Sequence, residues 1–173
     1  MNRSDPHARP ASDYEGHRRA SGIYGTIITA AVIAAGGNVL STAELEVTVL
    51  VTLLVYWVAE QYAHLLGEET HAGQLPSFGQ ARAGLAASWP MVTASFLPLL
   101  SIVVARGLGA SALGAAQIGL VLAVVLLVYY GHAAGRAAGL RGANLAAATI
   151  TAGLLGIAMI VLKTLLQRHH HMY

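Results

Sequence analysis

The sequence contains no cysteine and unusually few charged residues. The absence of cysteine excludes disulfide bonds, thiolate catalysis and thiolate metal sites. Seven of the 18 charged residues lie within the first 19 positions, so the remaining 154 residues carry only 11 charges. A soluble domain usually has about a quarter of its residues charged. The composition therefore excludes a disulfide scaffold, a disordered chain, a nucleic-acid-binding domain and nearly every soluble enzyme, and it indicates a small polytopic membrane protein.

Apolar residues are gathered into five stretches, each close to the ~20 residues that a helix needs to cross the hydrocarbon core. Helices are the expected form, because backbone polar groups in lipid must be satisfied within the segment. We therefore predict an all-α bundle of five transmembrane helices at 21–167, between a polar tail at 1–20 and a His-rich tail at 168–173. The predicted spans are approximately 22–40, 45–66, 87–105, 112–131 and 143–166.

The arginines and lysines near the ends of the spans predict the orientation, because cytoplasmic loops carry an excess of them. A cytoplasmic N-terminus places seven of these residues inside and three outside. The sequence therefore predicts that the N-terminus is cytoplasmic and that the C-terminal tail, with His169, His170 and His171, lies outside.

Small residues recur along the fourth span, where Gly131, Gly135 and Gly139 form a G-x-x-x-G-x-x-x-G pattern. Small residues allow helix backbones to approach closely in lipid. The pattern fits packing within one protomer, and it also fits the contact surface of a homo-oligomer. In the third span, Pro90 fits the first turn of a helix, whereas Pro98 lies mid-span and predicts a kink.

The second span carries polar residues that are costly in lipid. At 100° per residue, the side chains of Tyr56, Glu60, His64 and Glu68 share one face of the helix. Glu60 is the deepest of these, and an intramembrane acid is expected to face a bundle interior, a partner or water. His132 and Arg136, one turn apart at the end of the fourth span, have about the same predicted depth. We therefore predict a cytoplasmic-side cluster of Glu60, His64 and Glu68 with His132 and Arg136, and an ion or proton pathway that also includes Tyr56.

Three interpretations of this cluster remain open. In the first, Glu60 is neutralised by Arg136 or by a tyrosine and the cluster is structural. In the second, the residues form a proton or ion path, because histidine titrates near neutral pH and can exchange protons with a nearby acid. In the third, Glu60, His64 and His132 hold a transition metal, for which carboxylate and imidazole are suitable ligands.

Several strings of the sequence occur in a familiar order: RRASGIYGTI, VYWVAEQYAHLLGEE, SWPMV, YYGHAAGRAAG and IVLKTLL. Together they resemble a family of small bacterial integral membrane proteins of unassigned function, over roughly residues 18–166. His64, Gly131 and Gly135 match the family pattern. Glu60 stands where the family commonly has His, and Ser88 where it often has an acid. The resemblance implies a multi-pass protein of the bacterial inner membrane, supports five spans and implies no activity.

These observations favour a channel or transport protein, assembled as a homo-oligomer, that conducts protons or small ions along the polar face of the second span. A non-catalytic membrane scaffold or partner subunit is the alternative, and a metal-dependent intramembrane enzyme is the third hypothesis. We expect the lipid bilayer as a partner, no nucleic acid and no cofactor.

Overall fold

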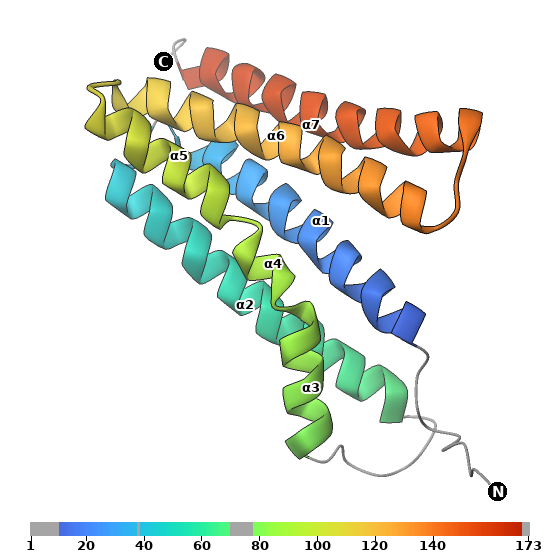
Figure 1. The fold of residues 1–173 in the computed structure, drawn as a ribbon. Helices are drawn as coiled ribbons and strands as arrows, with labels where there is room; N and C mark the ends of the chain where they lie inside the picture. The colour runs from blue at the N-terminus through green and yellow to red at the C-terminus, as the bar shows by residue number, and fades with distance from the viewer. Residues whose placement is uncertain (1–10, 38, 70–77, 171–173) are drawn as a thin grey trace, which may run out of the picture.

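The fold is all-α throughout the residues that the structure, a computed structural model, describes (Figure 1). These residues are 11–37, 39–69 and 78–170, without the side chains of 11–19, 65–69, 80–81, 162–163 and 165–170. The helices in this part of the chain are α1 (Ala11–Gly36), α2 (Thr42–Glu69), α3 (Phe78–Ser88), α4 (Pro90–Thr93), α5 (Phe96–Gly107), α6 (Ala112–Ala137) and α7 (Gly142–His170). The predicted all-helical class is confirmed. Helix α1 begins within the segment predicted to be a polar tail, and α7 runs into the predicted His-rich tail.

Within the part of the chain that the structure describes, four helical segments are long and apolar enough to cross a membrane: Thr42–His64, Arg82–Gly107, Ala112–Ala137 and Gly142–Val161. The third of these comprises most of α3 together with α4 and α5. The apolar part of α1, Ala20–Gly36, has 17 residues, which is the lower end of the length that spans a bilayer. The molecule is therefore a membrane protein with four long apolar helical segments and a shorter fifth one.

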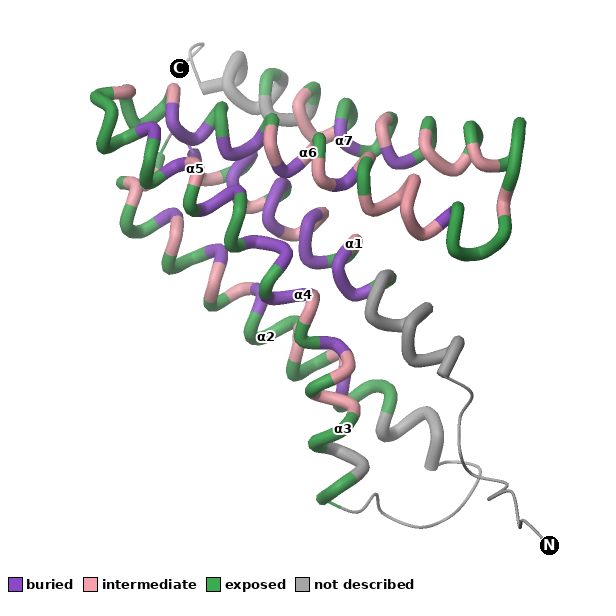
Figure 2. Tube along the Cα trace, in the orientation of Figure 1, coloured by how far each residue is buried: buried purple, intermediate pink, exposed green. Residues whose placement is uncertain are grey.

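Helix α1 lies at the centre of the bundle. It packs against α2, α4, α6 and α7, while α6 also packs against α5 and α7 (Figure 1). The core is made of aliphatic side chains and alanines from α1, α2, α5 and α6, among them the fully buried Ile33, Leu53 and Ala123, together with Met91 of α4. Figure 2 shows this as buried stretches along α1 and α6, with mostly exposed residues along the outer sides of α2 and α7.

The third span is interrupted twice. The first break, at Trp89, precedes Pro90, which begins α4 at a position where its missing N–H is tolerated. The second break lies at Ala94 and Ser95, one turn before Pro98. Since Pro98 has no N–H, it cannot donate the helical hydrogen bond to the Ala94 carbonyl. The kink predicted at Pro98 is therefore a break in the helix just ahead of it.

This interrupted span crosses α1 at Gly25. A Cβ atom at Gly25 would overlap the backbone carbonyl of Met91 in α4. Buried hydroxyl groups surround the crossing, and those of Thr26 and Thr29 donate to carbonyls of their own helix at 2.8 and 2.7 Å. These bonds allow the small polar side chains to lie in the core without an unpaired donor.

The glycine pattern of the fourth predicted span packs α6 against α7 of the same chain. A Cβ at Gly131 would lie 2.8 Å from Ala152 Cβ, and one at Gly135 would lie 2.9 Å from Leu145 Cδ1. Gly139 has a different role: it lies beyond the end of α6 with a φ of +78°. There the Leu140 N–H donates to the Gly135 carbonyl at 3.0 Å, as in a Schellman C-cap.

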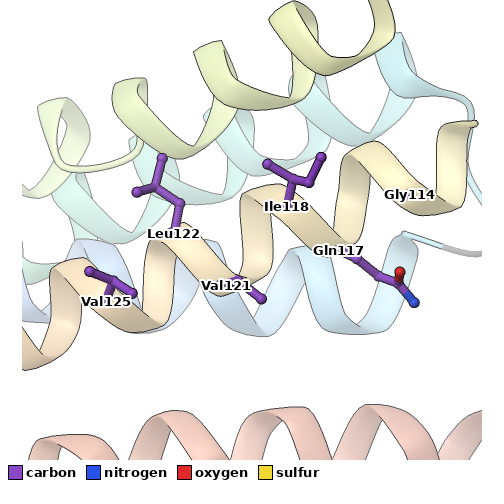
Figure 3. A pocket seen from close by; sticks show the side chains of 6 residues that line it. All are labelled: Gly114, Gln117, Ile118, Val121, Leu122 and Val125. Atoms are coloured by element: carbon purple, nitrogen blue, oxygen red, sulfur yellow. The ribbon is translucent and has the colours of Figure 1, made fainter. Parts of the chain in front are cut away.

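A groove runs along the outer face of α6 and is shown in Figure 3. Its lining is almost entirely apolar, and all of it comes from one helix: Gly114, Gln117, Ile118, Val121, Leu122 and Val125. Because α6 is long and apolar enough to cross a membrane, the acyl chains of lipids suffice to fill this groove.

The contact at Gly25 predicts the outcome of a substitution. We expect Gly25→Ala to reduce the free energy of unfolding by about 1–3 kcal/mol, because backbone must move to admit the methyl group. Gly22→Ala is the matched control, since a Cβ at Gly22 meets no atom within 4 Å. Unfolding of the purified protein in detergent, titrated with a denaturing detergent, measures both; equal stability of the two variants would contradict the crossing.

Candidate functional site

One face of α2 packs into the bundle along its whole apolar length. Leu45, Val49 and Leu53 are buried at four-residue intervals, and the buried Gln61 continues the series two turns later. At 100° per residue, Glu60 falls between Val49 and Leu53 on a helical projection. The face of α2 that was predicted to be polar therefore overlaps, at Glu60, with the buried face that packs against the neighbouring helices.

The Glu60 side chain is partly buried, and one carboxylate oxygen, Oε2, is shielded from solvent without a hydrogen-bond partner in the part of the chain that the structure describes. Glu60 lies inside the segment Thr42–His64 that can span a membrane. A shielded carboxylate oxygen without a hydrogen bond is costly in such a place.

Beside Glu60, a hydrogen-bonded link joins α2 to the interrupted third span. Gln61, only 5% exposed, donates from Nε2 to Ser88 Oγ at 2.7 Å. The Ser88 hydroxyl in turn lies 3.1 Å from the Gly84 carbonyl. Gly84 is needed here, since a Cβ at this position would lie 2.5 Å from Gln61 Oε1.

Two tryptophans complete this link. The indole N–H of Trp57 donates to the Leu85 carbonyl at 3.1 Å. The rings of Trp57 and Trp89 meet edge to face, with centroids 5.1 Å apart and planes inclined by 73°. An edge-to-face aromatic pair contributes about 0.5–1.5 kcal/mol beyond its buried area. These contacts therefore hold α2, the helix that contains Glu60, firmly against α3 and Trp89.

The other predicted residues of α2 are less enclosed. The Tyr56 side chain is 55% exposed, and that of His64 is exposed as well. Glu68 belongs to the last turns of α2, and its side chain lies outside the described residues, as do His169, His170 and His171.

His132 is held by α7. Its Nδ1 lies 3.1 Å from the Thr149 hydroxyl, which itself donates to the Leu145 carbonyl at 2.9 Å. A threonine hydroxyl has a single proton. With that proton on Leu145, the imidazole donates from Nδ1 to Thr149, and Nε2 of neutral His132 is then a lone-pair acceptor; in the other tautomer the Thr149 hydroxyl donates to Nδ1 instead.

Among the residues whose side chains are described, the structure does not bring Glu60 and His64 of α2 together with His132 and Arg136 of α6 within one protomer. Helix α2 packs against α1, α3, α4 and α5, whereas the main neighbours of α6 are α1, α5 and α7. In Figure 1, the last turns of α2 and α6 diverge on either side of α1. His132 accordingly contacts α7, and the Arg136 side chain is exposed at the end of α6. The expected proximity failed because similar depth in the membrane does not make two helices neighbours.

The same separation bears on the proposed metal ligands. Glu60 and His64 lie on α2, and His132 lies on α6. Among the described residues, no group of three or more His, Asp or Glu side chains is placed to hold a metal ion. The metal-site interpretation therefore has no support in the geometry of the protomer.

Four residues of this region were given no role from the sequence: Trp57, Gln61 and Ser88, which join α2 to the third span, and Glu46 near the opposite end of α2. The missed signal for Gln61 was its place in the four-residue repeat of buried positions that begins at Leu45. For Glu46, it was the seven-residue spacing of Glu46, Leu53 and Glu60, which places all three on one side of a helix.

The link between Gln61 and Ser88 can be tested by removing the hydroxyl. We expect Ser88→Ala to lower the free energy of unfolding by about 1–3 kcal/mol, because it leaves the buried Gln61 donor without a partner. Ser101→Ala is a suitable control, since this hydroxyl bonds within its own helix to the Pro98 carbonyl. The double variant Gln61→Leu with Ser88→Ala should recover part of the loss; strict additivity of the two substitutions would argue against the bond.

The tautomer of His132 is a second testable consequence. In nitrogen-15 NMR spectra of labelled protein in lipid, neutral His132 should show a protonated Nδ1 and an unprotonated Nε2. Thr149→Val removes the acceptor and should shift the equilibrium toward the other tautomer. A spectrum in which wild-type His132 already carries its proton on Nε2 would contradict the assignment.

No protein-family model, curated protein or solved structure matches this chain. The resemblance to a family of small bacterial membrane proteins accordingly stays a prediction, and the case for a function depends on the residues of α2 and their surroundings.

Proposed function

We propose that this protein is a membrane transport protein that carries protons or small cations along the side of α2 that contains Glu60. The observation that carries the proposal is the shielded Glu60 Oε2, which has no hydrogen-bond partner among the described residues and lies within a segment that can span a membrane. Intramembrane acids are expensive and in most cases serve ion or proton pathways. A carboxyl group without a fixed positive partner can exchange its proton or cation, whereas a salt-bridged one is already neutralised.

The third span lies next to this part of α2. Its backbone keeps helical φ and ψ at Trp89, Ala94 and Ser95, so the span is irregular at these residues without unwinding. Here the break at Trp89 lies beside the Gln61–Ser88 link, one residue along α2 from Glu60. The acid and the first break therefore belong to the same region of the bundle.

The proposed topology has five membrane crossings, made by α1, α2, the interrupted span, α6 and α7, with the N-terminus in the cytoplasm. Two features support it: the excess of arginine on that side, and the continuation of α1 beyond its apolar part to Ala11. We place the protein in the bacterial inner membrane, in keeping with the family resemblance.

We further propose that the working unit is a homo-oligomer. A single protomer leaves polar groups of α2 exposed within the membrane-spanning segment, notably Tyr56 and His64. Contact with a second copy would cover these groups and keep them out of lipid. The glycines Gly131 and Gly135 are already used against α7, so they do not supply this contact.

Ion flux into proteoliposomes tests the proposal. The purified wild-type protein should pass protons or small cations, and Glu60→Gln should reduce that flux by at least about tenfold, since the amide can neither release a proton nor balance a cation. Glu44→Gln is the matched control. Glu44 is an exposed acid on the same helix that accepts the Ser41 N–H at 2.9 Å in a capping box, a bond that glutamine also makes.

Wild-type vesicles without flux of any ion would overturn the proposal and favour a non-catalytic scaffold or partner subunit. Flux that is equal in Glu60→Gln and wild type would show a pathway that does not use this face of α2. Circular dichroism of each variant in the same lipid verifies that a loss of flux is not a loss of fold.

A further inference from the structure

Arg136 and Arg141 form a positively charged patch on the turn between α6 and α7. Both side chains are exposed, and neither has a hydrogen-bond or ion-pair partner among the described residues. The sequence from residue 70 to residue 173 contains six arginines and lysines and not one aspartate or glutamate. The acids whose side chains are described all lie on α2, on the other side of α1: Glu44, Glu46 and Glu60. The two arginines therefore have no described counter-charge.

The turn between α6 and α7 has the same backbone as the turn between α5 and α6, at the opposite end of α6 (Figure 1). Each turn contains a glycine of positive φ, Gly109 at +90° and Gly139 at +78°. In both, the residue after this glycine donates its N–H at 3.0 Å to the carbonyl five residues before it. Arg106 and Arg136 occupy the same place, three residues before the glycine. The two turns can therefore be compared side chain by side chain.

The side chains of the two turns differ. Arg106 folds back and donates from Nη1 to the Ala110 carbonyl at 2.6 Å, and Ser111 Oγ accepts a backbone N–H from the first turn of α6 at 3.1 Å. At the other turn, Arg136 makes no such bond, and Arg141 stands in the place of Ser111. The first turn therefore uses its polar side chains internally, whereas the second presents two guanidinium groups to its surroundings.

The length of α6 places this patch at the level of lipid headgroups. Helix α6 has 26 residues, which is about 39 Å at 1.5 Å per residue, whereas the hydrocarbon core is about 30 Å thick. The ends of the helix therefore extend beyond the hydrocarbon in either orientation of the protein. Tyr129 and Tyr130, with ring centroids 5.7 Å apart, lie about two turns before Arg136. Tyrosines gather at the membrane interface, in keeping with this depth.

We propose that the turn between α6 and α7 binds the anionic headgroup of a membrane phospholipid, with Arg136 and Arg141 on its phosphate. A guanidinium group matches phosphate oxygens with paired N–H donors, and basic sites between membrane helices bind anionic lipid headgroups. Two positive charges without a described counter-charge favour a headgroup with a net negative charge over a zwitterionic one. The acyl chains have the apolar spans of α6 and α7 to lie against.

Native mass spectrometry of the full chain in detergent, titrated with phosphatidylglycerol, tests the site. Wild type should bind this lipid, and Arg136→Gln should weaken its apparent affinity by about tenfold, because a charged hydrogen-bonding group is lost. Arg106→Gln is the matched control. It removes the same charge from the equivalent turn, where the guanidinium is already bonded to Ala110, and it should leave the affinity unchanged. Equal losses in the two variants would show general attraction to positive charge and would overturn the proposal.

Arg141→Ser separates lipid binding from loss of fold. The variant places before α7 the residue that precedes α6, where Ser111 caps the helix. Since serine is a favourable N-cap residue, Arg141→Ser should be at least as stable as wild type and still bind phosphatidylglycerol about tenfold more weakly. Wild-type lipid affinity in a folded Arg141→Ser variant would contradict the assignment.

Two further titrations of the wild-type protein identify the source of the phosphate. Phosphatidylcholine has the phosphate without a net charge, and glycerol phosphate has the headgroup chemistry without acyl chains. Both should bind at least about tenfold more weakly than phosphatidylglycerol, because one lacks the net charge and the other the apolar contacts. Equal binding of either compound would overturn the assignment to an anionic lipid. Since the site lies apart from Glu60, these outcomes do not depend on whether the protein passes ions.

Discussion

The close crossing of α1 with the interrupted third span is the contact on which the rest of the bundle depends. Gly25 allows the backbone of α4 to lie directly on α1, at the point where Pro90 and Pro98 prevent a continuous helix. In lipid there is no hydrophobic driving force between helices, so close backbone packing has to hold them together. Because α1 occupies this central place, α2 with α3 is held on one side of it and α6 with α7 on the other.

This arrangement explains why the polar residues of the molecule fall into separate groups. Glu60, Gln61 and Ser88 lie where α2 meets the third span, whereas His132 and Thr149 join α6 to α7. Each group uses hydrogen bonds between neighbouring helices, and such bonds add about 0.6 kcal/mol on average in membrane proteins. The Glu60 carboxyl differs from these groups, because its shielded Oε2 has no hydrogen-bond partner among the described residues.

The candidate site could be predicted only in part. Glu60 could be singled out from the sequence as a residue that is costly in lipid, since one acid inside an apolar stretch is visible without a structure. Equal predicted depth placed His132 and Arg136 beside Glu60, and that proximity is absent from the protomer. Glu46 could be placed only as a residue of a span end, because the shielding of its carboxyl depends on neighbours distant in the chain.

The sequence by itself determined the helical class, the membrane environment and the approximate limits of the apolar segments, because these follow from local composition and from the need to satisfy backbone polar groups in lipid. It also indicated the interruption at Pro98, which is a local consequence of the missing N–H. Only the tertiary structure decided which helices are neighbours, that Gly131 and Gly135 face α7 of the same chain, and which carboxyl oxygens are shielded. Apolar helices of similar length can pack in many orders, and the choice among them depends on shape complementarity at sites such as Gly25, which no local pattern encodes.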